Sequence, residues 1–185
     1  QAEYIVFCGV HFMAEAADIL TSDHQQVVLP DLNAGCSMAD MADIDTVEEA
    51  WEALGEVTDI EKVVPITYMN SAADLKAFVG SHGGAVCTST NARAVLEWAL
   101  RSPDGPQASQ VLFFPDQHLG RNTGHQMGFA EHDMAVWNPR QDLGGLDEST
   151  VKDATFLLWK GHCSVHQRFK PAHIADFREQ NPGGI

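Results

Sequence analysis

Two cysteines, Cys36 and Cys163, lie in polar turns where their side chains could do chemistry. Cys36 lies in the loop NAGCS, and Cys163 lies in the turn GHCS, three residues before His166. A polar loop offers a thiol little apolar packing, and two thiols brought to one edge of a sheet could share a metal ion or an iron–sulfur cluster. Packing of each thiol remains the alternative interpretation.

The other two cysteines are better explained by packing. Cys8 lies inside the apolar run YIVFCGV, and Cys87 directly ends the run GAVC. A buried free thiol in such a run behaves as a small hydrophobic side chain. The cysteines are far apart and form no C-x-x-C pair, which is not the pattern of a disulfide framework. We therefore expect reduced thiols and a cytoplasmic protein.

Polar side chains also follow two of the apolar runs. Tyr68 and Asn70 alternate around Met69, so on a strand they face the same side, which suits recognition of a carboxylate or carbonyl group. Thr88 and Ser89 precede a helical pattern, where hydroxyls and free backbone amides can bind an anion. An ordinary helix cap explains that second pair almost as well.

Further polar residues cluster after the run QVLFF. Asp116 and His118 follow this run, and His118 and His125 flank the segment LGRNTG, which contains Arg121. These basic side chains could meet an anion, with a solvated loop as the alternative. His11 opens a helical pattern, and we interpret it as a polar helix start rather than a metal ligand.

Apolar runs alternate with helical patterns along the chain. The predicted strands are 4–10, 26–31, 62–70, 84–90, 110–116, 134–138 and 155–161, and the predicted helices are 11–20, 38–54, 71–81 and 91–102, the last capped by Asn91. Residues 120–150 are rich in Gly, Asn, Asp and Pro, which predicts a loop around one short strand.

This alternation predicts an α/β fold in which helices cover both faces of a parallel sheet, as in a three-layer α/β/α module. The units VVLPD at 27–31 and LFFPD at 112–116 are similar, which fits duplicated modules. Ligands bind such sheets outside the carboxyl ends of the strands. Most of the polar residues singled out above lie at those ends.

Charge and hydropathy exclude two classes of partner. The net charge is −15 with only 11 Lys and Arg residues, so no basic stripe is available for nucleic acid. No run of 18 apolar residues occurs, and we expect no membrane association. An anionic substrate would need a locally positive site made by helix N-termini, backbone amides, histidines or a metal.

Six segments together resemble the quinolinate synthase (NadA) family. They occur in the family's order and approximate spacing, and they extend over nearly the whole chain: FCGVHFMAE (7–15), LPDLNAGCSMAD (29–40), YMNS (68–71), CTSTNA (87–92), PDQHLGRNTG (115–124) and WKGHCSVHQRF (159–169).

The resemblance implies a condensing transferase that joins iminosuccinate to dihydroxyacetone phosphate, giving quinolinate for de novo NAD synthesis, with L-aspartate oxidase as a functional partner. It also implies three α/β/α domains related by pseudo-threefold symmetry around the active site. On that pattern, residues 1–60 belong to the first domain, 61–170 form the second, and 171–185 begin the third.

The family's cofactor is a [4Fe-4S] cluster held by three cysteines, one from each domain, with one iron left open as a Lewis acid. Cys36 and Cys163 match the first two ligands, whereas Cys8 and Cys87 do not. The third ligand is expected beyond Ile185, and the family's N-terminal strand is expected before residue 1. We therefore expect this chain alone to be inactive.

The resemblance also assigns substrate contacts. Tyr68 and Asn70 match the pair that binds iminosuccinate, with Met69 contributing through its backbone, and Ser89 matches a serine that binds a carboxylate. His166 lies beside the second cluster cysteine and is the candidate catalytic residue.

Two alternatives to the cluster enzyme stay open. One is a cluster-free module that binds dicarboxylates through Tyr68, Asn70 and Ser89. The other is a structural zinc protein that uses Cys36, Cys163 and His166, the donor types that zinc prefers.

Overall fold

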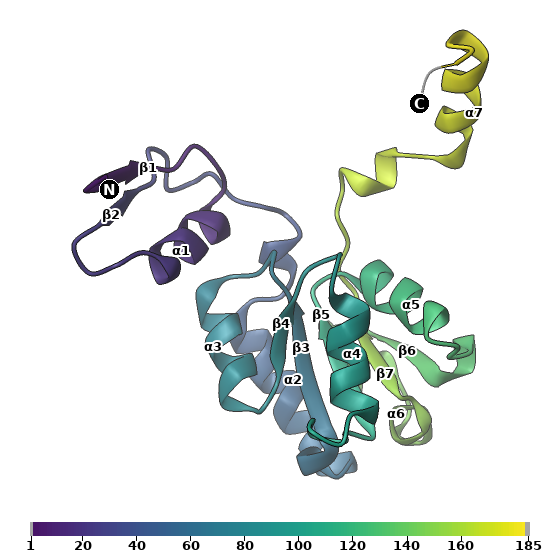
Figure 1. The fold of residues 1–185 in the computed structure, drawn as a ribbon. Coiled ribbons are helices and arrows are strands. Elements are labelled where there is room, and N and C mark those ends of the chain that lie inside the picture. Colours follow the sequence, from purple (N-terminus) through teal and green to yellow (C-terminus); the bar gives the residue numbers. More distant parts are fainter. Residues whose placement is uncertain (1, 184–185) are drawn as a thin grey trace.

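The computed structural model describes residues 2–183 (Figure 1). The strands are β1 Tyr4–Val6, β2 Gln26–Val28, β3 Val63–Tyr68, β4 Ala85–Cys87, β5 Gln110–Phe114, β6 Met134–Trp137 and β7 Phe156–Trp159. The α-helices are α1 His11–Leu20, α2 Ile44–Val57, α3 Ala73–Ser81, α4 Ala92–Arg101, α5 Gln117–Gln126, α6 Glu148–Asp153 and α7 Pro171–Gln180.

The strands form two parallel sheets, which confirms the predicted α/β class. The larger sheet has five strands in the order β4-β3-β5-β7-β6, and the smaller sheet pairs β1 with β2. In the larger sheet, Ile66 of β3 lies opposite Phe113 of β5, and Leu112 of β5 lies opposite Leu157 of β7. All carboxyl ends of this sheet therefore meet at one edge.

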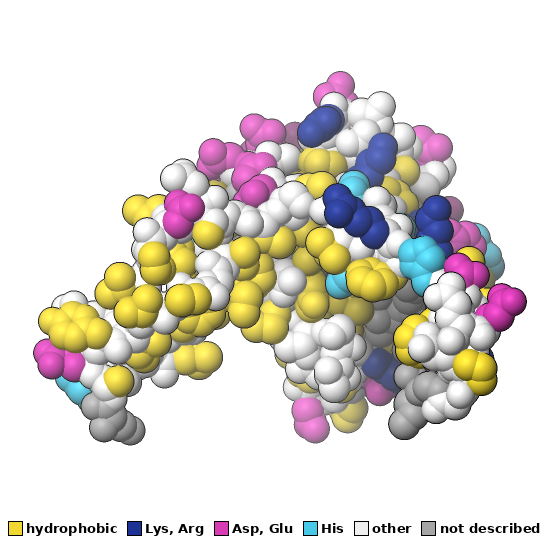
Figure 2. Space-filling model, turned by 90° about the horizontal axis from the view of Figure 1, so that it is seen from above, with side chains coloured by type: hydrophobic (Ala, Val, Ile, Leu, Met, Phe, Trp, Pro, Cys, Tyr) yellow, Lys and Arg dark blue, Asp and Glu magenta, His cyan; other side chains and the backbone are white. Residues whose placement is uncertain are grey.

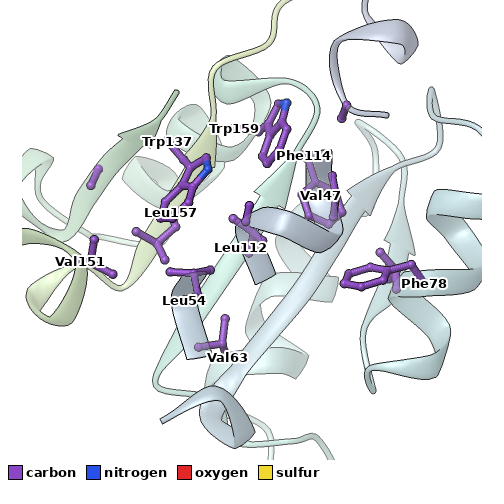
Figure 3. Close-up of a cluster of buried hydrophobic side chains, with 14 of the residues drawn as sticks. Val47, Leu54, Val63, Phe78, Leu112, Phe114, Trp137, Val151, Leu157 and Trp159 are labelled. Carbon is purple, nitrogen blue, oxygen red and sulfur yellow. The ribbon is translucent and has the colours of Figure 1, made fainter. Parts of the chain in front are cut away.

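Helices cover both faces of the five-stranded sheet because its strands are apolar on both sides. Leu112 and Phe114 of β5 join a buried cluster with residues of α2, α3 and α6 (Figure 3). Val111 and Phe113 point the other way and pack with residues of α4 and α5. The alternation of side chains along one strand thus supplies two cores, and the result is a three-layer α/β/α module.

Helix α2 packs with the five-stranded sheet although it lies within the predicted first domain, 1–60. Its buried residues Val47, Ala50 and Leu54 belong to the same cluster as Leu112 and Leu157 (Figure 3). The domain boundaries themselves stay a prediction.

The small N-terminal sheet and the last helix are far less buried. In Figure 1 they extend from the central module in two different directions. Helix α1 buries only Phe12 and Ala14 among its residues, and the centroid of the Phe12 ring lies 5.6 Å from Lys76 Nζ of α3. Tyr4 remains 59% exposed and Val6 62% exposed, and hydrophobic side chains are visible across this region at the left of Figure 2. Helix α7 buries no residue.

The prediction that residues 120–150 form a loop around one strand was wrong at both ends of that segment. Helix α5 extends to Gln126, and α6 begins at Glu148. A Cβ on Gly120 would lie 2.6 Å from Leu158, and one on Gly124 would lie 2.6 Å from Met134. These glycines therefore let α5 lie close against the sheet, so their role is packing rather than a turn.

Within residues 2–183, no helix has both the length and the apolar character needed to cross a membrane.

Candidate functional site

A cavity of about 460 Å³ opens at the carboxyl edge of the five-stranded sheet. The ends of β3, β4, β5 and β7 contribute to it, together with the first turns of α5. Its lining consists of Tyr68, Ser89, Asp116, His118, Leu119, Asn122, Cys163, His166 and Gln167. The cavity lies where ligands bind open parallel sheets, and most of its polar groups can donate hydrogen bonds.

Tyr68 and Ser89 form one side of the cavity. Tyr68 is the last residue of β3 and pairs in register with Cys87 of β4, so Ser89 follows at the neighbouring strand end. Burial raises the pKa of the Tyr68 phenol; a hydrogen bond with Ser89 opposes this, and the charge of Asp116 raises the pKa further. Tyr68 is therefore a protonated hydrogen-bond donor at neutral pH.

The turn before α4 resolves the two interpretations of its hydroxyls. Helix α4 begins after Asn91, as predicted, but the Asn91 side chain makes no capping hydrogen bond to the helix. Thr88 donates its N–H to Asn91 Oδ1 at 2.6 Å, and Asn91 donates its N–H to Thr88 Oγ1 at 3.4 Å. Thr88 is thus engaged in the turn that starts the helix, while Ser89 is the residue that lines the cavity.

Asp116 forms the floor between the two sides of the cavity. Its side chain is only 5% exposed, and its Oδ1 accepts the N–H of His118 at 2.9 Å, which caps α5. His118 and Asn122 are one helical turn apart on α5 and both line the cavity.

The third side of the cavity comes from the turn after β7. Cys163, His166 and Gln167 line it, and Gln167 donates its N–H to the Cys163 carbonyl at 3.2 Å. The turn is attached to the end of β5, because Gln117 donates its N–H to the carbonyl of Gly161 at 3.1 Å.

Cys36 does not line the cavity, but its loop lies beside the Cys163 turn. The hydroxyl oxygens of Ser37 and Ser164 are 3.5 Å apart, and both cysteines are half-buried free thiols. Two thiols on adjoining turns are suitable as two ligands of a thiolate-held cluster.

Among residues 2–183, no three His, Cys, Asp or Glu side chains come close enough together to hold one metal ion. The zinc alternative requires Cys36, Cys163 and His166 at one point, and the described residues do not support it.

The remaining cysteines differ from each other. Burial raises the pKa of the Cys87 thiol to about 12, so Cys87 is an inert core residue, as predicted. Cys8 was predicted to be buried in a strand, and this was wrong. Strand β1 ends at Val6, and Cys8 is exposed. Only three residues of the apolar run 4–10, Tyr4 to Val6, pair with another strand.

Of the predicted substrate residues, the structure brings Tyr68, Ser89 and His166 to the cavity. Met69 and Asn70 follow the end of β3, and neither belongs to the cavity lining formed by the described residues. Because the strand ends at Tyr68, the alternation of side chains does not extend to Asn70. The Met69 N–H donates to the Cys87 carbonyl at 2.8 Å.

Other basic residues near α5 do not face an anion site. Arg121 and His125 both pair with Glu131, at 3.2 and 3.0 Å, so the predicted anion loop is a helix whose charges are matched. His11 begins α1, as predicted, and lies 3.4 Å from Glu15.

Sequence reasoning missed Leu119, Asn122 and Gln167 as parts of the cavity. The first two could have been found from helical spacing after Asp116, had residues 117–126 been recognised as a helix. Gln167 carried no signal, because its position depends on how the Cys163 turn folds back.

Comparison with known proteins assigns this chain to a family. The family model described as Quinolinate synthetase A protein (NadA) matches residues 1–184. Among curated relatives, the quinolinate synthase of Streptomyces coelicolor is 56% identical over 184 residues. That of Corynebacterium glutamicum is 56% identical over 182 residues, and that of Bacillus subtilis is 54% identical over 182 residues.

These matches include nearly all of this chain but not all of the relatives. They cover 98–99% of the chain and 45–48% of the three relatives. The chain therefore spans about half the length of the curated relatives it matches.

Proposed function

This chain belongs to the Quinolinate synthetase A (NadA) family, and from that premise we propose that the protein containing it is a quinolinate synthase. In this proposal it condenses iminosuccinate with dihydroxyacetone phosphate, releasing phosphate and water, for NAD synthesis in the cytoplasm. L-Aspartate oxidase is the proposed functional partner. The observation that carries the proposal is the cavity that Tyr68, Ser89 and Cys163 line together.

The hydroxyls of Tyr68 and Ser89 are proposed to bind iminosuccinate. The Tyr68 phenol, whose ordinary pKa of about 10 is raised further by burial, keeps its proton at neutral pH and can donate a hydrogen bond to a carboxylate or imine group. Asn70 and Met69 are proposed as further contacts. The Met69 N–H is already used by Cys87, so the Met69 contact would use its carbonyl oxygen.

Helix α5 and the Cys163 turn offer donors for a second anionic group. His118 and Asn122 of α5 and Gln167 of the turn line the cavity and can supply ring or amide N–H groups, which an acidic protein needs to offset substrate charge locally. We assign His166, an exposed residue of the cavity lining, the role of holding or moving a proton during the condensation.

Cys36 and Cys163 are the residues that would hold a [4Fe-4S] cluster, with the third cysteine supplied from outside residues 1–185. Such a cluster supplies an open iron that polarises a substrate oxygen or nitrogen as a Lewis acid. The position of Cys163 in the cavity lining supports a cluster at the edge of the substrate site.

The test uses the full-length protein that contains this chain, reconstituted anaerobically with iron and sulfide. We expect a brown protein with about four irons per chain that forms quinolinate from the two substrates. Cys36→Ala and Cys163→Ala should each abolish the visible absorption and the activity, because each removes a ligand. Cys8→Ala, at an exposed position outside the strand, is the matched control and should retain both.

Other outcomes identify the alternatives. A colourless protein that binds dicarboxylates without turnover would support the cluster-free module and contradict the proposal. Loss of iron only in Cys8→Ala would also contradict it. For the isolated 185-residue chain, which offers two of the three proposed ligands, we expect no stable iron.

A further inference from the structure

The turns that carry Cys36 and Cys163 lie side by side, although they are far apart in the chain. The only hydrogen bond that joins the tips of these two turns, among the residues described, is the 3.5 Å contact between the hydroxyls of Ser37 and Ser164, 127 residues apart. Both serines are exposed, and a long hydrogen bond between exposed side chains is weak. Something else must therefore hold the turns together.

The buried indole of Trp159 is the first element of that support. Trp159 ends β7, is fully buried, and packs edge-on against Phe114 with ring centroids 6.0 Å apart. Its Nε1–H donates to the carbonyl of Met41 at 2.6 Å. Met41 lies five residues after Cys36, and Trp159 lies four residues before Cys163. This hydrogen bond therefore links the segments that carry the two cysteines through the fully buried side chain of Trp159.

Met41 makes a second contact to the same turn. The N–H of His162 lies 3.4 Å from Met41 Sδ, so the Met41 side chain and its carbonyl both face the segment that leads to Cys163. Met41, the last residue of the short 3-10 helix Ala39–Met41 that follows the Cys36 loop, is thus attached at two points to the chain that emerges from β7.

Gly161 is the second element of the support. A Cβ at this position would lie 2.1 Å from the carbonyl oxygen of Pro115 and 3.5 Å from Met41 Cβ. The Gly161 backbone forms an isolated β-bridge with Asp116. Only glycine lets the Cys163 turn pass between the end of β5 and the Cys36 loop at this distance.

We propose that Trp159, Gly161 and Met41 are positioning residues that set the separation of Cys36 and Cys163. The Trp159–Met41 hydrogen bond attaches the end of β7 to the segment that follows Cys36. The absence of a side chain at Gly161 lets the two segments lie this close together. The inference rests on the proposed function only for the identity of the group that the two thiols share. The proposed effect on the distance between the two cysteines does not depend on that group, and we test it on the free thiols.

The test measures how fast a short bifunctional maleimide cross-links Cys36 to Cys163 within the 185-residue chain, by peptide mass spectrometry. A Cys8→Ser background removes the exposed thiol, and Cys87 is buried. In the Trp159→Phe variant the aromatic body stays and the Nε1 donor is lost, so we expect about a fivefold slower intramolecular cross-link. Gly161→Ala should slow it at least about tenfold, because the turn must move.

Trp137→Phe is the matched control. Trp137 is 2% exposed and belongs to the same buried cluster as Trp159, but it makes no described hydrogen bond to the Cys36 loop. It should cross-link at the parent rate, and Ser37→Ala should change the rate less than about twofold.

The outcomes separate positioning from general loosening of the core. A parent rate in Trp159→Phe would overturn the proposal, as would an equal slowing in Trp137→Phe. If Gly161→Ala does not fold by circular dichroism, Trp159→Phe decides the question alone. Slow cross-linking in Trp159→Phe together with a full-length protein that takes up no iron would keep the positioning and reject the proposed function.

Discussion

The five-stranded sheet and the β1–β2 sheet are built from similar apolar runs, yet they bury them to very different extents. All of β5, from Gln110 to Phe114, is buried, whereas Tyr4, Val6 and Val28 are 59%, 62% and 42% exposed. The larger sheet has helices on both faces, and the small sheet has α1 as its helix. An apolar strand is therefore buried only where neighbouring elements complete its surroundings.

The turns that carry Cys36 and Cys163 are attached to the larger sheet in different ways. Cys163 lies in the turn after β7, an interior strand of the larger sheet, and belongs to the cavity lining. Cys36 lies in the segment between β2 and α2, and its loop reaches the larger sheet through Met41. The position of Cys36 is thus determined by contacts with the five-stranded module rather than by its own small sheet.

Removing an apolar side chain from each sheet gives the largest expected difference. Leu157→Ala removes a fully buried residue of β7 and should lower the free energy of unfolding by about 3 kcal/mol, because it leaves a cavity. Val28→Ala, at a position 42% exposed, should cost less than about 1 kcal/mol. Urea denaturation followed by circular dichroism measures both, and equal losses would contradict the comparison.

Two glycine substitutions test how closely the helices pack against the larger sheet. Gly120→Ala should destabilise the fold by about 2 kcal/mol, because its Cβ would lie 2.6 Å from Leu158. Gly80→Ala in α3 meets nothing within 4 Å and should stabilise the fold by about 0.5 kcal/mol, since alanine favours helix. Thermal denaturation of the two variants should shift in opposite directions. A stabilised Gly120→Ala would mean that α5 does not lie against the sheet as described.

A smaller loss than for Leu157→Ala or Gly120→Ala is expected at the cap of α2, the helix that connects the Cys36 loop to the larger sheet. Burial tends to raise the pKa of Asp43, but hydrogen bonds from the N–H and hydroxyl of Thr46 lower it overall. The cap's contribution is complete above the ordinary pKa of an aspartate, near 4, and is lost as pH falls through the lowered folded-state value.

Asp43→Ala should therefore cost about 1 kcal/mol at neutral pH and less at low pH, as measured by urea denaturation across pH. Asp43→Asn retains a capping oxygen and should remove the pH-dependent part while keeping most of the stability. If Asp43→Ala cost the same at low and neutral pH, the ionised cap would not be the source of the effect.

Much of the fold and part of the site could be predicted from local sequence. Apolar runs between helical patterns predicted a parallel α/β sheet, because strands that helices cover on both faces are usually apolar throughout. Parallel strands place their carboxyl ends at one edge. Residues that follow those strands, such as Tyr68, Ser89 and Cys163, were therefore expected to meet, and they line one cavity.

The remaining features depend on contacts between residues that are far apart in the sequence. Gly120 and Gly124 disfavour helix locally, yet α5 forms because their missing side chains let it pack closely on the sheet. The run that contains Cys8 is apolar, yet Cys8 is exposed because pairing ends at Val6. The bond from Trp159 to Met41 joins residues 118 positions apart, and no local pattern encodes a contact over that distance. The relative position of the two cysteine turns is therefore a property of the folded chain.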